Sequence, residues 1–357
     1  MTLKQKIGLG LLVFLPLSWM AVAWQADELL VCLTAGLAIV PLAIWLSTAT
    51  EELAVLTGPT IGGLLNAVFG NATELILALV TLRAGLVEVV KASITGTVVA
   101  NLLLVLGLAM LLGGLRHKEQ RFQAIVPQVN APSMTLAVVA IFLPTLLTNT
   151  VEGREIAPNA IENLSVVVAA VLMAVYGLTL LFSLKTHSYL YDVGVAELGE
   201  THEKPNVWLW LGVLAAATVG VAVESEIFVG VIEKATEKLG LTPLFTGVIL
   251  LPLLGGAAEY VTAVNVAMKN NMDLAISVAM GSSALVALLV TPVLVIVGKM
   301  WGQPMDLHFN LFEVVAVALA VTVANMISLD GRSNWLEGSL LLASYVVMAV
   351  AFYYHPA

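Results

Sequence analysis

Cysteine and charged residues are both scarce in this chain of 357 residues, and each shortage excludes a class of protein. A single cysteine, Cys32, allows no disulfide framework and no metal site built from several thiolates. Charged residues make up 11% of the chain, whereas soluble domains average about 25%. This composition excludes an ordinary soluble enzyme.

Basic residues are particularly few, with 15 Lys and Arg against 24 Asp and Glu and a net charge of −9. Their densest group is the sparse trio Arg116, Lys118 and Arg121. Nucleic-acid binding needs a basic surface, so nucleic acid is excluded as a partner.

Apolar residues, in contrast, make up 60% of the chain and form long uninterrupted segments. A membrane-spanning helix needs about 20 mostly apolar residues, whereas a transmembrane barrel needs alternating strands, which stretches such as 102–112 do not show. We therefore predict an all-α integral membrane protein with eleven transmembrane helices, near residues 7–24, 29–47, 61–82, 89–114, 134–150, 164–184, 207–230, 244–267, 274–299, 309–328 and 335–354.

The first apolar run follows Lys4 and Lys6 and has the form of a signal sequence. Its length, and the lack of a clear cleavage site after it, favour a retained helix. With the N-terminus inside, nine Lys and Arg fall on the cytoplasmic side and six outside, in the sense of the positive-inside rule. We expect a multi-pass protein of the cell (inner) membrane, surrounded by lipid bilayer, with a cytoplasmic N-terminus.

The sequence also repeats itself at an offset of 185 residues. Residues 61–75 align with 246–260, so that the pattern Gly-x-Ala-x-Glu ends at Glu74 in one segment and at Glu259 in the other. Two units of five helices would insert in opposite directions, as in secondary transporters with inverted repeats. We predict an extra N-terminal helix in 1–28, a first repeat in 29–184, an acidic linker loop in 185–206 and a second repeat in 207–357.

Glu74 and Glu259 are the main candidate site residues because each lies near the middle of an apolar segment. An ionised carboxylate at that depth costs several kcal/mol unless a cation or a proton compensates it. Two facing carboxylates cannot easily both stay ionised without a cation, so protons and a divalent cation are expected to compete for them.

Small and polar residues surround both glutamates in the helical pattern. Gly70 and Asn71 share a helix face with Glu74, as Gly255 and Gly256 do with Glu259. Nearby Gly and Pro residues can break the helices and free backbone carbonyls, namely Gly58-Pro59, Gly62-Gly63, Pro243 and Pro252. Such an oxygen-rich site suits Ca²⁺.

Further oxygens come from the helices that follow each glutamate. The motifs Thr95-Gly96-Thr97 and Gly281-Ser282-Ser283 fall at matching repeat positions. We include Thr97, Ser282 and Ser283 in the candidate site, although small polar residues also serve helix packing. The amide of Asn101 fits either role. Glu51 and Glu226, near span ends, are candidates for cation access or gating.

These motifs resemble the calcium:proton exchanger family of the cation/Ca²⁺ exchanger superfamily. The similarity rests on the segment from Gly70 to Ile76, preceded by Gly58-Pro59 and Gly62-Gly63, and extends to the motifs beginning at Ala267, Gly281, Thr291 and Asp330. It implies a fold of one extra helix plus two inverted units of five, with Ca²⁺ bound by Glu74 and Glu259.

The second signature departs from the family pattern. Gly256 and Tyr260 stand where the family usually has Asn and His, and Leu285 stands where it has Gln. Three polar groups are therefore replaced on one side of the implied site.

We therefore expect a secondary antiporter that exchanges Ca²⁺ for H⁺ by alternating access, with Ca²⁺ as substrate and no cofactor. Alternatives are an exchanger driven by Na⁺ or one that carries another cation, an intramembrane enzyme and a channel. The five histidines lie in loops or at the chain end, which disfavours an enzyme. The oligomeric state, including a homo-oligomer, stays open.

Overall fold

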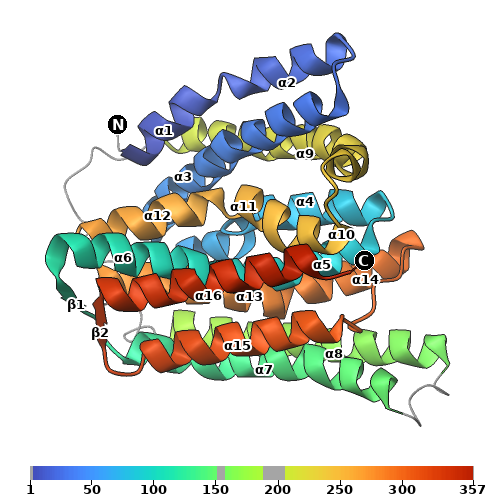
Figure 1. Ribbon diagram of the computed structural model, residues 1–357. Coiled ribbons are helices and arrows are strands. Elements are labelled where there is room, and N and C mark those ends of the chain that lie inside the picture. Colours follow the sequence, from blue (N-terminus) through green and yellow to red (C-terminus); the bar gives the residue numbers. More distant parts are fainter. Residues whose placement is uncertain (1–2, 151–156, 188–205, 357) are drawn as a thin grey trace.

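A computed structural model describes residues 3–150, 157–187 and 206–356 of the chain (Figure 1). Nearly all of these residues are helical, which confirms the predicted all-α class. Of the predicted linker loop 185–206, residues 188–205 lie outside the described part.

The first half of the chain contains eight α-helices, two π-helical segments and one short strand among its described residues. In order they are α1 (Leu3–Leu11), α2 (Phe14–Ala23), α3 (Glu28–Phe69), α4 (Ala72–Arg83), α5 (Val87–Val99), η1 (Ala100–Val105), α6 (Leu106–His117), β1 (Glu119–Arg121), α7 (Ile125–Asn149), α8 (Pro158–Leu181) and η3 (Phe182–Thr186).

The second half begins with the long helix α9 and ends with α16, close to the C-terminus. Its elements are α9 (Val207–Lys238), α10 (Pro243–Phe245), η6 (Thr246–Leu250), α11 (Leu251–Gly255), α12 (Ala257–Met268), α13 (Met272–Leu285), η7 (Val286–Val290), α14 (Thr291–Trp301), α15 (Leu311–Ile327), β2 (Arg332–Asn334) and α16 (Trp335–Tyr354).

Within the described ranges, eight helices are long and apolar enough to cross a membrane, or nine if the bent pair 243–255 and 257–268 forms one span. Helix α15 is apolar but shorter. The predicted crossing at 61–82 is divided between α3 and α4 at Gly70 and Asn71, so it does not form one continuous apolar helix. The number eleven therefore stays a prediction.

Helix α3 does not run straight, although its 42 residues are all helical. A straight helix of that length would measure about 63 Å, yet a Cβ on Gly62 would lie 2.5 Å from the carbonyl oxygen of Ala54. The helix axis therefore folds back between these residues, in the interval that holds Gly58 and Pro59. Proline lacks the N–H that would continue the hydrogen-bond pattern.

The internal repeat reappears in the helix boundaries. Adding 185 to the bounds of α4 gives 257–268, which are the bounds of α12. The same offset carries α5, η1 and α6 onto α13, η7 and α14 to within one residue at each end. In Figure 1, α4 and its match α12 lie toward opposite ends of the molecule, as do α6 and its match α14.

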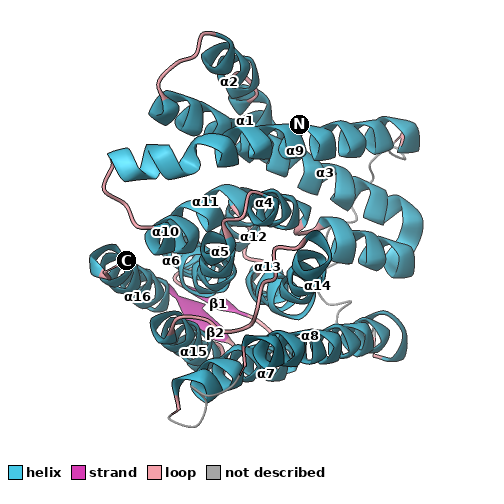
Figure 2. Cartoon of the chain, turned by 90° about the vertical axis from the view of Figure 1, so that its right-hand side faces the viewer, coloured by secondary structure: helices cyan, strands magenta, loops and turns pink. Residues whose placement is uncertain are grey.

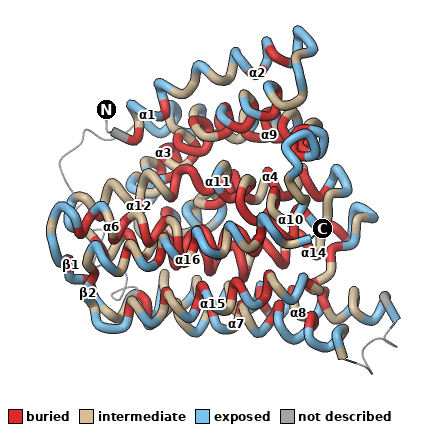
Figure 3. The backbone as a smooth tube through the Cα atoms, viewed as in Figure 1, coloured by how far each residue is buried: buried red, intermediate tan, exposed pale blue. Residues whose placement is uncertain are grey.

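The helices form three layers, seen nearly end-on in Figure 2. Helices α1, α2, α3 and α9 form one outer layer, with α1, α2 and α9 packed against α3. Helices α7, α8 and α15 lie on the opposite side, and the repeated helices lie between them. Buried residues gather in this middle layer (Figure 3), where α5 is buried from Val89 to Val99.

Two polar contacts fix the ends of the molecule. Near the end of α6, strands β1 and β2 pair antiparallel, and Nε2 of Gln120 donates to the carbonyl oxygen of Ala267 at 2.8 Å. At the other end, Nζ of Lys238 lies 2.6 Å from a carboxylate oxygen of Asp27. This hydrogen bond lowers the pKa of the Asp27 carboxyl and joins α9 to the start of α3.

Candidate functional site

Both predicted glutamates lie at breaks in the helical path. Glu74 is in the first turn of α4, just after the break at Gly70 and Asn71. Glu259 is in the first turn of α12, after Gly256, where the path bends by 58°. These glycines break the path next to the carboxylates. A helix N-terminus favours a negative charge through its free N–H groups, so both breaks help to hold a carboxylate at membrane depth.

Two adjacent glycines bring the glutamate side chains into one region. A Cβ on Gly255 would lie 3.1 Å from Cγ of Glu74, and a Cβ on Gly256 would lie 3.8 Å from Oε2 of Glu259. A larger residue at 255 would push against the Glu74 side chain. Gly255 therefore leaves the space that the Glu74 side chain occupies, whereas a Cβ at 256 would make only an ordinary contact with Glu259.

Each carboxylate keeps one buried oxygen without a hydrogen-bond partner in the described part of the chain. These atoms are Oε1 of Glu74 and Oε2 of Glu259, and the residues are 9% and 7% exposed. A buried charged oxygen without a partner is costly. A bound cation or a proton would remove that cost, because either one supplies the missing positive charge.

A hydroxyl and two amides connect the repeats beside the glutamates. Nδ2 of Asn71 and Nδ2 of Asn101 both donate to Oγ of Ser282, the second at 3.0 Å. A hydroxyl has two acceptor lone pairs, so both are used here. Asn101, which the sequence left open, therefore belongs to the same network as Asn71 and Ser282. Its place in the π-helical segment η1 fits the frequent occurrence of such segments at functional sites.

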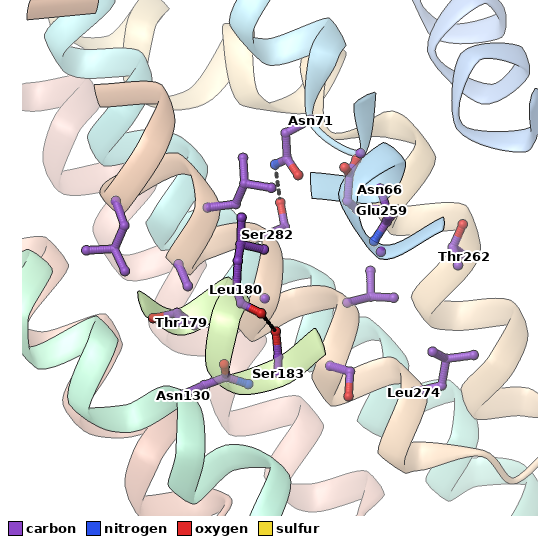
Figure 4. A pocket seen from close by; sticks show the side chains of 18 of the residues that line it. Asn66, Asn71, Asn130, Thr179, Leu180, Ser183, Glu259, Thr262, Leu274 and Ser282 are labelled. Atoms are coloured by element: carbon purple, nitrogen blue, oxygen red, sulfur yellow. Dashed lines mark hydrogen bonds between the residues drawn. The ribbon is translucent and has the colours of Figure 1, made fainter. Parts of the chain in front are cut away.

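A cavity of about 480 Å³, lined by both polar and apolar residues, adjoins this network (Figure 4). Asn71 and Ser282 point toward one another in its wall, with Glu259 and Asn66 beside them. Gly70 and Glu51 also line the cavity, as predicted site residues. Sequence reasoning had not assigned several further polar lining residues to the site, namely Ser47, Asn66, Asn130, Thr262, Asp273 and Ser277.

Helical spacing could have identified part of this missed set. Asp273, Ser277 and Gly281 are four residues apart and share a face of α13, and Thr262 follows Glu259 by three residues. Asn130 has no such signal, because it comes from a distant helix, α7.

Glu74 faces a different and much smaller space. A cavity of about 20 Å³ is lined by Glu74, Thr97, Ser93 and Gly255, among others. That volume has room for about one water molecule. Glu259 therefore lines the large cavity and Glu74 the small one, where Thr97 accompanies it.

Three predicted residues line neither cavity, and of these only Gly256 lies beside a glutamate, Glu259. Ser283 is buried and its hydroxyl donates to the carbonyl oxygen of Ala279 within its own helix at 2.9 Å. Glu226 is exposed on α9, with Oε1 3.7 Å from Nη1 of Arg83. Neither residue is brought to the glutamates in this structure.

Comparison with known proteins adds an independent finding. The profile of the sodium/calcium exchanger protein family matches residues 28–185 and 209–354. A Ca(2+)/H(+) antiporter of Aphanothece halophytica is 58% identical over 99% of this chain and 98% of its own length. A Ca(2+)/H(+) antiporter of Synechocystis sp. is 59% identical over 100% and 99%.

The solved structure of native YfkE has a TM-score of 0.84 and 35% identity, and it covers 97% of this chain and 99% of its own. The H+/Ca2+ exchanger CAX, with a TM-score of 0.71 and 15% identity, shares the fold.

The repeat offers a test of how the altered second signature affects cation binding. At the repeat offset of 185, Gly256 corresponds to Asn71 and Ser282 corresponds to Thr97. Asn71 contacts Ser282, so Gly256→Asn would add the matching amide opposite Thr97. Combined with Tyr260→His and Leu285→Gln, we expect it to raise Ca²⁺ affinity at least tenfold, because each added polar ligand contributes about 1 kcal/mol and about 1.4 kcal/mol corresponds to a factor of ten. Binding isotherms on the folded triple variant measure this. An unchanged or weaker affinity would show that the added groups do not reach the ion.

Proposed function

The chain belongs to the sodium/calcium exchanger protein family, and from this premise we propose that it is an antiporter that exchanges Ca²⁺ for H⁺ across a membrane. The names of two relatives similar over almost the whole chain support this choice of ions. We further propose that Glu74 and Glu259 bind the transported ions. The observation that carries this proposal is the pair of buried carboxylates, each with an unpartnered oxygen.

The chemistry of the surrounding groups supports Ca²⁺ as the substrate. Ca²⁺ takes six to eight oxygen ligands from carboxylates, amides, backbone carbonyls and water. The two glutamates and the amide oxygen of Asn71, whose nitrogen donates to Ser282, provide oxygens of these kinds, and the adjoining cavity has room for water. The nitrogen and sulfur ligands that favour transition metals are absent from the described lining residues of this cavity.

Exchange follows from charge balance at the two carboxylates. One Ca²⁺ or two protons bring the same positive charge, so either occupant removes the cost of burying two negative groups. Both at once would leave an excess of positive charge in the membrane interior. The occupants therefore exclude each other, which is the requirement for antiport at a single site.

The unequal surroundings of the two glutamates support alternating access. Glu259 faces the large cavity, whose wall includes Glu51 close to Lys4 near the N-terminus, whereas Glu74 lines only the small cavity. In two repeats of opposite direction, exchanging their conformations would open Glu74 toward the other side. With the N-terminus in the cytoplasm of a bacterial cell, the present cavity faces the cytoplasm.

An exchanger driven by Na⁺ is the second candidate. The specific observation in its favour is the family profile itself, which describes sodium/calcium exchangers. A channel would not need a site that only one side can reach at a time, and an enzyme does not agree with the transport function of the relatives.

Neutralising either glutamate should abolish exchange. Glu74→Gln and Glu259→Gln each remove one charge with little change in shape, and we expect Ca²⁺ binding to weaken at least ~30-fold, since a charged ligand contributes about 2 kcal/mol. Transport in reconstituted vesicles and Ca²⁺ binding in detergent measure this. Glu226→Gln is the matched control, because Glu226 is exposed and outside both cavities. Normal transport by either buried variant would contradict the two-glutamate site.

The pH dependence should come from the carboxylates and not from histidine. The cavity lining includes none of the four described histidines, which are His117, His187, His308 and His355. A ring nitrogen of His117 lies 2.9 Å from the carbonyl oxygen of Met268. His202 lies outside the described residues. We expect apparent Ca²⁺ affinity to weaken as pH falls, because protons take the site. The same shift is expected in a variant without histidines.

Binding isotherms between about pH 5.5 and 8.5, a window that contains the usual titration range of histidine, measure this dependence. If the isotherms do not move with pH, protons and Ca²⁺ do not share the site. If they move only in the wild type, a histidine carries the effect.

A further inference from the structure

The N-terminal helix, which belongs to neither repeat, places a buried ammonium group against the cavity wall. Nζ of Lys4 lies 2.7 Å from Oε1 of Glu51 and 2.9 Å from Oγ of Ser47. Oγ of Ser47 also donates to the same Glu51 oxygen at 3.1 Å. The Lys4 side chain is 8% exposed and that of Glu51 is 50% exposed. The lysine therefore approaches Glu51 from behind, while the carboxylate stays open on its other side.

The contact is fixed by the packing of α1 on α3. Lys4 and Gly8 are four residues apart on one face of α1, and a Cβ on Gly8 would lie 3.0 Å from Cγ2 of Ile44. Further along, the buried hydroxyl of Ser18 on α2 donates to Oε2 of Glu224 on α9 at 2.7 Å. The N-terminal helices are thus attached at both ends, and Lys4 has little freedom to leave Glu51.

Charge in the cavity gives this contact a consequence for ion binding. The charged residues among the described cavity lining are Glu51, Glu259 and Asp273, all acidic. Without Lys4, Glu51 would be a half-open carboxylate in the same cavity as Glu259. A cation entering the cavity would then meet a third strong oxygen ligand and a more negative field.

On the basis of the proposed function, we propose that Lys4 is a resident counter-cation that prevents Glu51 from acting as a further carboxylate ligand for Ca²⁺. Lys4 itself does not bind the substrate. Because the charge of Lys4 compensates that of Glu51, Ca²⁺ is bound by the carboxylates of Glu74 and Glu259 and not also by Glu51. This limits the Ca²⁺ affinity of the cavity. Lys4 and Glu51 together thus set how readily Ca²⁺ leaves the open cavity.

The test compares Ca²⁺ binding by single and double variants of the full-length protein in detergent. Lys4→Gln frees Glu51, and we expect Ca²⁺ affinity to rise by about fivefold or more, since one negative charge near a divalent cation is no longer compensated. Lys4→Gln combined with Glu51→Gln removes the pair without changing net charge, so affinity should return to the wild-type value. Lys4→Arg keeps the charge and should also bind as the wild type does.

Lys6→Gln is the matched control, because Lys6 is exposed on the same helix and its loss changes net charge equally. Should Lys4→Gln fail to accumulate, Lys4→Met fills the same buried space without charge and should show the same rise. An unchanged affinity in folded Lys4→Gln and Lys4→Met would overturn the proposal. So would a rise that Lys6→Gln reproduces, or one that persists when Glu51 is also replaced.

The same measurements separate this proposal from the proposed function. If the wild type does not bind Ca²⁺, or if Glu259→Gln binds it unchanged, the two-glutamate site fails. If Glu259→Gln loses binding while Lys4→Gln changes nothing, only the role of Lys4 fails.

Discussion

The cost of holding two carboxylates away from water is the constraint on which the rest of this structure depends. Glu74 and Glu259 are buried, and each has an oxygen without a hydrogen-bond partner in the described chain. Several features around the two glutamates reduce this cost, namely the helix breaks, the glycines at 255 and 256 and the polar groups of Asn71 and Ser282. They provide N–H groups, space and oxygen atoms around the two charges, and the remaining requirement for positive charge falls to the transported ions in the proposed mechanism.

Much of the architecture could be predicted because it follows from membrane physics and from repetition. Apolar segments predicted an all-α membrane protein, and the offset of 185 that aligned the two Gly-x-Ala-x-Glu patterns also relates the bounds of α4 and α12. A buried glutamate in an apolar segment is rare enough to identify a candidate site from sequence alone. The inclusion of Gly70, Asn71 and Ser282 followed from helical spacing and from the repeat, and the structure places all three at the cavity.

What could not be predicted depends on contacts between segments far apart in the chain. The reversal within α3 depends on the close approach of Gly62 to Ala54, and sequence periodicity does not report such an approach. The sequence does not show which way the Asn101 side chain points, whereas the structure shows its amide donating to the hydroxyl of Ser282. Glu51 and Glu226 looked equivalent as acidic residues near span ends, yet one lines the cavity beside Lys4 and the other is exposed near Arg83. Such differences arise from the packing of α1, α3 and α9, which no local motif encodes.

The central claim is that this site couples Ca²⁺ to protons, and one transport measurement tests it most directly. The wild-type protein is reconstituted into vesicles, and uptake of radioactive Ca²⁺ is recorded under an imposed pH gradient, acidic inside, and separately under an outward Na⁺ gradient at equal pH. The account predicts accumulation of Ca²⁺ with the pH gradient and none with the Na⁺ gradient alone. Accumulation that requires Na⁺ and ignores the pH gradient would contradict it.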